Sequence, residues 1–367
     1  MSLGGKFAGL FVACVVAAGA AAAQADGPYV VRGATGGLEA WSVEAAADGA
    51  RKHVDRLQPG ATLGIPAVGS WPAFAVTLRG PAAPAPDELA VPAKSPIFVV
   101  ADTHGEFEIL AQMLVAQQVV DARLRWSFGR GHLVVLGDVF DRGPEHLEIL
   151  WLLYALEAQA TKAGGGVHLV LGNHEVMALT GDARYLNPKY VETAQVLGVP
   201  AYAQLFAKDS VLGQWLRSKP VMLKVNDLLC LHGGVSRALL DQELSLAQIN
   251  DAVRQWLGGE SPPEEAARAE FLTTTLGPLW YRGYFAESAD FTGATLADVD
   301  LTLARYDVRR ILVGHTIVPT ITPLYDGRVI AVQVYPKREA GAVHFESLLV
   351  RDGKLLRAMP DGSVHPL

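Results

Sequence analysis

The sequence predicts an α/β fold, because short aliphatic runs alternate with longer helical patterns from about residue 96 onward. Runs of four or five aliphatic residues are typical of buried strands, and spacings of three and four indicate helices. Helical patterns are clearest at 106–119 and 146–160. The aliphatic runs with the strongest strand character are 97–100, 132–136, 167–171, 228–231 and 310–313.

A short polar cluster follows each of these runs. In an open α/β sheet, ligands bind beyond the carboxyl ends of the strands, so the position of the clusters indicates one shared site. Together they offer aspartate, asparagine and histidine side chains, which are metal ligands, and an arginine. In chain order the clusters are Asp102-Thr103-His104-Gly105, Gly137-Asp138-Val139-Phe140-Asp141-Arg142-Gly143, Gly172-Asn173-His174-Glu175, Leu231-His232-Gly233-Gly234 and Val313-Gly314-His315-Thr316.

The first two clusters have the chemistry of a dinuclear metal site that cleaves phosphate esters. Asp102 and His104 are two residues apart, so both can reach one ion from an extended strand end. A carboxylate such as Asp138 can bridge two cations, and two cations can clamp the reacting phosphate oxygens. The planar guanidinium of Arg142 matches a phosphate group.

The remaining clusters supply further ligands and a proton donor. Asn173 offers a carbonyl oxygen, and the imidazoles of His232 and His315 suit zinc, iron and manganese. Imidazole is also the side chain best suited to proton transfer near neutral pH. We therefore expect His174 to act as a general acid, with Asp141 holding its other ring nitrogen.

The order of the motifs D-x-H-G, G-D-x-x-D-R-G, G-N-H-E, H-G-G and G-H resembles the phosphoprotein phosphatase (PPP) family of metallophosphoesterases. The resemblance covers about residues 96–335. Two further segments, 172–185 and Leu-Trp-Tyr-Arg-Gly at 279–283, resemble the bacterial Shewanella-like phosphatases.

This resemblance implies a calcineurin-like catalytic domain at 96–367, with a central β-sandwich flanked by helices. The stretch 176–220 is helical, aromatic and polar, so we expect it to form a cap over the site. It also implies two metal ions, manganese, iron or zinc, and attack on phosphorus by a metal-bridging hydroxide. The implied ligands of one metal are Asp102, His104 and Asp138, and those of the other are Asp138, Asn173, His232 and His315. Arg142 and Arg282 are the implied phosphate-binding residues.

The sequence departs from the family pattern at two positions. Ala101 stands where glycine usually precedes the first aspartate, and the strand expected at 328–334 lacks an aspartate often found there. Neither departure removes a metal ligand. The role of Arg282 rests on a short Arg-Gly match.

The N-terminal quarter has a different character. Residues 1–25 have the composition of a secretory signal peptide, with an apolar run at 7–23 and Ala-Gln-Ala at 23–25. An uncleaved membrane anchor or a lipid anchor at Cys14 are the alternatives. We expect an exported protein, periplasmic or secreted, without stable membrane insertion after cleavage. Residues 26–95 then form a small β-rich module, with β-like runs at 29–31, 38–43 and 74–78 and a proline-rich linker at 81–86.

The composition limits the classes of molecule that the protein can bind. The formal net charge is −7 and no dense Lys/Arg run occurs, which excludes a sequence-independent grip on nucleic acid. We expect a phosphatase of phosphorylated proteins or peptides, on serine/threonine or tyrosine. A phosphatase of small molecules, a diadenosine tetraphosphate hydrolase and an inactive phosphate-binding module are the alternatives. The signal peptide disfavours a hydrolase of cytosolic nucleotides, and the complete ligand set disfavours an inactive module.

Overall fold

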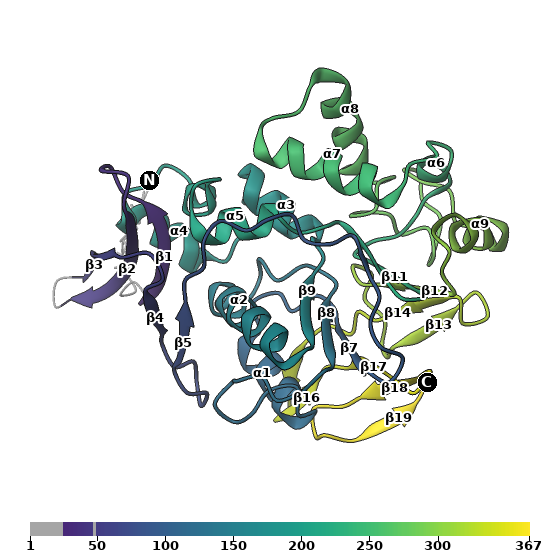
Figure 1. The fold of residues 1–367 in the computed structure, drawn as a ribbon, viewed down its shortest axis with the longest axis horizontal. Coiled ribbons are helices and arrows are strands. Elements are labelled where there is room, and N and C mark those ends of the chain that lie inside the picture. Colours follow the sequence, from purple (N-terminus) through teal and green to yellow (C-terminus); the bar gives the residue numbers. More distant parts are fainter. Residues whose placement is uncertain (1–24, 47–48) are drawn as a thin grey trace, which may run out of the picture.

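The computed structural model describes residues 25–46 and 49–367. Two six-stranded sheets form its centre, and their apolar side chains belong to one continuous hydrophobic core (Figure 1). The predicted α/β fold class with its central pair of sheets is confirmed. Except for Ala25, the predicted signal peptide lies outside the described residues, as does Cys14.

Three parallel strands form one half of the first sheet. Strands β7, β8 and β9 run parallel, and β17 pairs antiparallel with β7. In spatial order the strands are β19 (Val364–Pro366), β18 (Lys354–Ala358), β17 (Ser347–Arg351), β7 (Ile97–Val100), β8 (His132–Val135) and β9 (Gly166–Leu169).

The second sheet is mixed. Strands β11, β12 and β14 run parallel to one another, and β10 pairs antiparallel with β11. In spatial order its strands are β13 (Thr322–Leu324), β14 (Val329–Ala331), β12 (Arg310–Val313), β11 (Leu228–Leu231), β10 (Met222–Val225) and β6 (Glu88–Leu89). The five aliphatic runs of the sequence are thus β7, β8, β9, β11 and β12.

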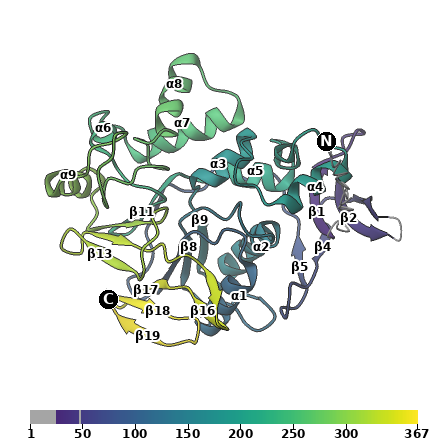
Figure 2. The ribbon, with the colours of Figure 1, turned by 180° about the vertical axis from the view of Figure 1, so that it is seen from behind.

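The helices surround the sheets, and Figure 2 shows the same arrangement from behind. The helical patterns at 106–119 and 146–160 are α1 and α2. The described helices are α1 (Phe107–Ala116), α2 (His146–Ala163), α3 (Asn173–Thr180), α4 (Pro188–Leu197), the 3-10 helix η1 (Tyr202–Phe206), α5 (Val211–Arg217), α6 (Arg237–Leu240), α7 (Leu246–Gly258), α8 (Pro263–Leu272) and α9 (Leu296–Tyr306).

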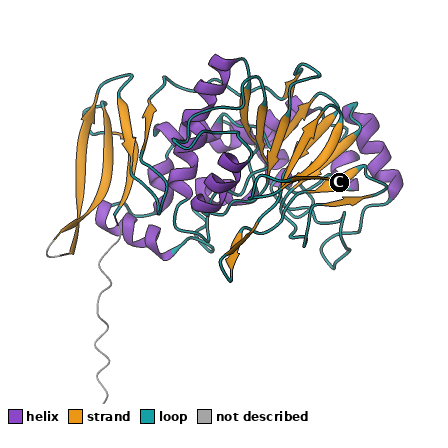
Figure 3. Cartoon of the chain, turned by 90° about the horizontal axis from the view of Figure 1, so that it is seen from below, coloured by secondary structure: helices purple, strands orange, loops and turns teal. Residues whose placement is uncertain are grey.

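Strands of the N-terminal region lie at one end of the molecule, with helices between them and the sandwich (Figure 3). They are β1 (Asp26–Arg32), β2 (Leu38–Ala46) and β3 (Gly49–Leu57) in one sheet, and β4 (Thr62–Ile65) with β5 (Phe74–Thr77) in a hairpin. The β-like runs of the sequence correspond to β1, β2 and β5. Strand β3 gave no signal in the sequence because its largely exposed side chains show no apolar alternation.

The proline-rich segment 81–86 has no regular secondary structure, and Ala85 N–H donates to the Ser218 carbonyl at 2.8 Å. No helix of the described residues is long and apolar enough to span a membrane. Cys230 lies buried on β11, where burial raises the pKa of its thiol to about 12. That thiol is therefore unreactive near neutral pH.

The stretch 176–220 differs from the expected cap. Helix α4 packs against β2 and β3, and α5 and η1 pack against β1. Buried aromatic side chains account for this arrangement, since Tyr202 and Phe206 lie edge-on to Tyr29 of β1. Of this stretch, only Tyr185 borders the cavity described below, which is lined by all the predicted ligands except His232.

Candidate metal centre

The predicted ligands converge at the carboxyl ends of strands from both sheets. The loops after β7 and β8 and the start of α3 contribute from one side, and the loops after β11 and β12 contribute from the other. A cavity of about 270 Å³ lies at this junction. The side chains that the sequence singles out as ligands are 0–6% exposed: Asp102, His104, Asp138, Asn173, His232 and His315.

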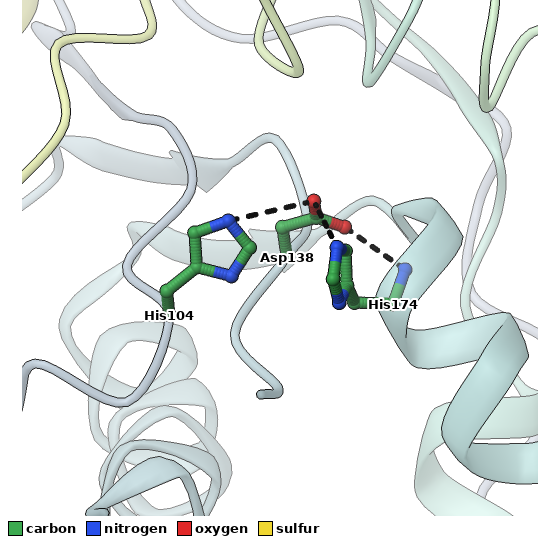
Figure 4. Close-up of side chains that lie close together, drawn as sticks. All are labelled: His104, Asp138 and His174. Carbon is green, nitrogen blue, oxygen red and sulfur yellow. Dashed lines mark hydrogen bonds and ion pairs between the residues drawn. The ribbon is translucent and has the colours of Figure 1, made fainter. Parts of the chain in front are cut away.

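Asp138 lies at the centre of the cluster. In Figure 4 its carboxylate lies between the rings of His104 and His174. Its Oδ2 atom is 3.9 Å from His104 Nε2 and 3.7 Å from His174 Nε2. The same oxygen is 3.1 Å from His232 Nε2, so one carboxylate oxygen faces both sides of the cavity.

A second group of donor atoms gathers around His232. Its Nε2 atom is 3.0 Å from Asn173 Oδ1 and 3.1 Å from His315 Nδ1. Asp138, His232 and His315 form one set of donors that can hold a metal ion, and His104, Asp138 and His174 form another. Asp138 belongs to both sets, as a bridging ligand must.

Two of the imidazoles are oriented by the backbone. His104 Nδ1 bonds to the Phe140 carbonyl at 3.0 Å, and His232 Nδ1 bonds to the Leu136 carbonyl at 2.7 Å. A carbonyl only accepts, so Nδ1 carries the proton in each ring, and Nε2, which lies near Asp138 Oδ2, is the potential ligand. The Nδ1 atom of His315 lies 3.1 Å from His232 Nε2, so it is the ring nitrogen of His315 that lies among the other donor atoms. The donor set therefore fits metal ions.

Charge states within the cluster follow from burial and neighbours. Burial lowers the pKa of His104 to about 4, so this ring is neutral and able to ligate near pH 7. Burial opposes the charge of His232, but the Asp138 and Asp102 carboxylates prevail and raise its pKa to about 9. Burial disfavours an ionised Asp138, yet His232 and His174 hold the pKa of that carboxyl well below its ordinary value. A metal ion must therefore displace a proton from His232.

Asp102 lies beside both groups. Its Oδ2 atom is 4.0 Å from His104 Nε2, and its Oδ1 atom accepts from His315 N–H at 3.1 Å. Burial raises the pKa of Asp102 to about 7, with His232 opposing and Asp138 adding to the shift. A cation in the cavity would favour its ionised form.

His174 and Asp141 form the pair that the sequence predicts. His174 Nδ1 is 2.6 Å from Asp141 Oδ2, and both side chains are buried. Burial lowers the pKa of His174, but the Asp138 charge and the hydrogen bond to Asp141 outweigh it, so the pKa is raised overall. His174 therefore carries a proton to higher pH than an ordinary histidine does.

Both predicted arginines line the cavity, although 140 residues separate them in the chain. The guanidinium of Arg282 is fixed because Nη1 donates to the His315 carbonyl at 2.8 Å and to Thr316 Oγ1 at 3.0 Å. Arg142 is exposed, and its guanidinium carbon lies 5.5 Å from the ring centre of Tyr185. Two cationic groups thus face a cavity that also contains the metal ligands.

Glu175 is a site residue whose role the sequence did not reveal. This fully buried carboxylate accepts the N–H groups of Asp138 at 2.8 Å, Val139 at 2.7 Å, Phe140 at 3.3 Å and Gly172 at 2.7 Å. It therefore joins the loop after β8 to the start of α3. The sequence feature that could have pointed to this role is the position of Glu175 directly after Asn173 and His174 in the Gly-Asn-His-Glu cluster.

Gly172 makes this junction possible. A Cβ atom at this position would lie 2.2 Å from Asp138 Oδ1 and 2.6 Å from Asp138 N. Only glycine permits so close an approach. As a result, the backbone N–H of His174 donates to Asp138 Oδ1 at 3.0 Å, which holds the shared carboxylate at the N-terminus of α3.

Comparison with known proteins identifies the class. Residues 95–319 match the model of the calcineurin-like phosphoesterase family, and the chain belongs to this family. A solved structure of the cold-active protein-tyrosine phosphatase of a psychrophilic Shewanella species is similar over 94% of this chain and 99% of that chain, with 32% identity and a TM-score of 0.79. The resemblance to metallophosphoesterases inferred from the motifs is confirmed.

Curated relatives point to the same group. Shewanella-like protein phosphatase 1 of Plasmodium berghei is 29% identical over 227 residues, which are 61% of this chain and 62% of that protein. The match thus spans less than two thirds of that relative. A symmetrical bis(5'-nucleosyl)-tetraphosphatase of Chromobacterium violaceum is 28% identical over 44% of this chain and 54% of its own length.

Proposed function

We propose that this protein is a metal-dependent phosphatase that hydrolyses phosphate monoesters of phosphorylated proteins or peptides. One observation carries the proposal: metal-type ligands, His174 and two arginines line a single cavity. Asp141 bonds to His174 from behind, and the donor sets share Asp138. Metal ions bound here would polarise the phosphoryl oxygens and lower the pKa of water. Asp102, His104 and Asp138 would hold one ion, and Asp138, Asn173, His232 and His315 the other.

His174 is better suited to proton transfer than to metal binding. Its Nε2 atom lies near Asp138, but its pKa is raised and its Nδ1 atom is held by Asp141. A protonated imidazole has no lone pair for a metal and instead donates a proton. We therefore assign His174 Nε2 as the donor to the leaving alkoxide or phenoxide, with Asp141 orienting the ring.

The arginines would neutralise and orient the phosphate group. Arg282 is half-buried and fixed by the His315 carbonyl and Thr316, so it presents its charge without reorganising. Arg142 is exposed and lies in the loop between β8 and α2. Between them they supply donors suited to phosphate oxygens.

Two features of the rim support an aryl phosphate on a polypeptide. Aromatic side chains of Tyr185, Trp280 and Tyr335 line the cavity, and the Shewanella relative is named a tyrosine phosphatase. A second, mostly apolar groove of about 550 Å³ borders the cavity, since Ile317 and Tyr335 line both. Ile317 is 62% exposed, so a substrate chain leaving the cavity would meet an apolar surface.

A substitution in this groove can distinguish polypeptide substrates from small-molecule substrates. Val343 lies on β16 (Ala342–His344), which pairs with β15 (Lys337–Glu339), and it lines the groove but not the cavity. Val343→Asp should lower kcat/KM for phosphotyrosine peptides by about tenfold, the effect of losing about 1.4 kcal/mol of binding. p-Nitrophenyl phosphate fits the cavity alone, so its turnover should not change.

Val364→Asp is the matched control, because Val364 is 39% exposed on β19 away from both cavities. Equal losses of activity on the peptide and on p-nitrophenyl phosphate in Val343→Asp would contradict a peptide groove.

The primary assay of the proposed function compares hydrolysis of a phosphotyrosine peptide, a phosphoserine peptide and diadenosine tetraphosphate after metal depletion and add-back. Faster cleavage of the dinucleotide than of either peptide would favour the nucleotide hydrolase, which the partial match to tetraphosphatases keeps as the second candidate.

We also propose that the enzyme acts outside the cytoplasm, which the signal-like composition of 1–25 supports. Mass spectrometry of the N-terminus of protein from a cell-envelope fraction should find a chain beginning at Asp26. A chain recovered with Met1 in the cytoplasm would contradict export.

A further inference from the structure

Gln333 occupies a position equivalent to that of a predicted ligand. Strands β12 and β14 are parallel neighbours with Val313 opposite Ala331. His315 follows Val313 by two residues, and Gln333 follows Ala331 by two residues. The side chain of Gln333 lines the same cavity as Asp102, His104 and Arg282.

The side-chain amide of Gln333 lacks hydrogen-bond partners. The residue is 0% exposed, and neither Nε2 nor Oε1 has a partner among the described residues. A primary amide offers two donors and an acceptor with two lone pairs. Buried polar groups in folded proteins are nearly always paired, so such a group at the wall of a site indicates a ligand that completes its bonding.

A neutral amide suits this place electrostatically. Asp102 and Asp138 already lie in the cavity, and a third carboxylate would repel both them and an anionic phosphate. An amide instead supplies N–H donors without adding charge. Its donors complement those of Arg142 and Arg282, which line the same cavity.

We propose that Gln333 is a phosphate-binding residue of this site, whose Nε2 donates a hydrogen bond to an oxygen of the bound phosphoryl group. The inference rests on the proposed phosphatase function and adds to it a residue outside the predicted set of ligands, acid and arginines. Gln333 acts on the anion and takes no part in holding the metal ions.

The test measures binding of inorganic phosphate to metal-loaded protein by calorimetry, with bound metal counted by mass spectrometry. Gln333→Met keeps the length of the side chain and removes its hydrogen bonds. We expect its Kd for phosphate to rise about tenfold, as for one lost hydrogen bond to a charged group, with the metal content unchanged. Gln333→Glu, which adds a negative charge, should weaken phosphate binding further.

The same variants give a readout that needs neither metal nor turnover. Metal-free Gln333→Met should have a higher melting temperature than metal-free wild type, because a buried unpaired amide has been replaced by an apolar group. Ser347→Ala is the matched control: Ser347 is also fully buried with an unpaired side chain, but it lies on β17 and does not line the cavity. It should leave phosphate affinity unchanged.

An unchanged Kd for phosphate in Gln333→Met, or no phosphate binding by the wild type, would overturn the proposal. Loss of bound metal in Gln333→Met would also overturn it, because Oε1 would then be a metal ligand. Failure of the proposed function looks different: metal-loaded wild type would bind phosphate but hydrolyse no phosphate ester, while the Gln333→Met difference in Kd persisted.

Discussion

Several site residues have backbone conformations that L-residues adopt at a cost. The φ angles are 44° at His104, 53° at Asp138, 70° at Asp141, 65° at Arg142 and 61° at His315. Left-handed conformations at non-glycine residues persist where the surrounding structure enforces them, and they concentrate at functional sites. Here they turn the chain sharply after β7, β8 and β12, and all of these side chains except Asp141 line one cavity.

Because Asp138 belongs to both donor sets, its loss should affect both metals. Asp138→Asn keeps the shape of the side chain but removes its negative charge and replaces one of the two oxygens with an N–H donor group. We expect kcat/KM to fall at least about 100-fold, more than the loss of a group that only orients a ligand. Metal analysis should show reduced occupancy. Asp182→Asn, at a surface ion pair with Arg184, is the control, and near-wild-type activity of Asp138→Asn would refute the shared-carboxylate site.

The His174–Asp141 pair makes a prediction about pH. The pKa of His174 is raised by Asp138 and Asp141, so the protonated acid persists above its usual range and activity declines as pH rises through the raised pKa. Asp141→Asn removes one of these charges and lowers the pKa of His174. The alkaline limb of the kcat profile should therefore move to lower pH, with a larger loss on alkyl phosphates than on p-nitrophenyl phosphate. If the alkaline limb of the pH profile does not move in Asp141→Asn, His174 is not the general acid.

At the scale of elements, the site depends on the junction between β8 and α3. Glu175 accepts N–H groups from both sides of this junction, and Gly172 allows the close approach. Strands β11 and β12 are parallel and in register, which brings His232 and His315 to the same edge of their sheet. Each element thus delivers one or two ligands, and their meeting depends on how the two sheets pack.

Glu175→Gln should weaken metal binding although Glu175 lies in neither donor set. The carboxylate accepts four N–H groups, and an amide would point N–H donors at some of them. We expect metal affinity and kcat/KM to fall by about 10–100-fold, as for other groups that orient a ligand. Metal titration followed by activity checks this. Glu192→Gln on the exposed face of α4 is the control, and equal behaviour of the two variants would contradict the orienting role.

At the scale of the molecule, β1 is joined to the catalytic region by buried polar contacts. Asp26 accepts hydrogen bonds from Tyr29 at 2.6 Å and Thr193 at 2.8 Å, and it pairs with Lys189 at 2.9 Å. Trp151 Nε1 on α2 donates to the Pro28 carbonyl at 2.9 Å. The N-terminal strand therefore braces α2 and α4, the helices on either side of the segment that carries Asn173 and His174.

Asp26→Ala should destabilise the whole protein. It leaves the Lys189 side chain buried, with Glu148 at 3.8 Å as its remaining ion-pair partner among the described residues. Breaking a buried ion pair typically costs about 3–5 kcal/mol, and we expect about 3 kcal/mol in denaturant unfolding of the purified protein. Glu44→Ala, which breaks an exposed pair with Arg51, should cost less than about 1 kcal/mol. Equal losses in the two variants would show that β1 is not anchored by Asp26.

Much of the fold and ligand set could be predicted from local pattern. The aliphatic runs correctly predicted strands β7, β8, β9, β11 and β12. The polar residues directly after these runs are the candidate metal ligands that lie close together in the structure. Strand β3 was missed because its largely exposed side chains make no apolar alternation. Helix α7 was missed although its sequence carries a local signal, a capping box at Ser245 and Gln248 before an amphipathic pattern. The position of α4 and η1 was also missed, since buried contacts with β1 decide it.

By itself, the sequence determined which side chains stand at the carboxyl ends of strands and in which order, and hence the class of chemistry. Only the tertiary structure decided that Arg282 joins Arg142, that Glu175 supports the loop of Asp138, and that Gln333 lines the cavity unpaired. The physical reason is the separation along the chain between the residues that determine each feature. Periodicity and strand ends depend on neighbours in the chain, whereas these contacts join residues that meet only when two sheets and their loops pack together.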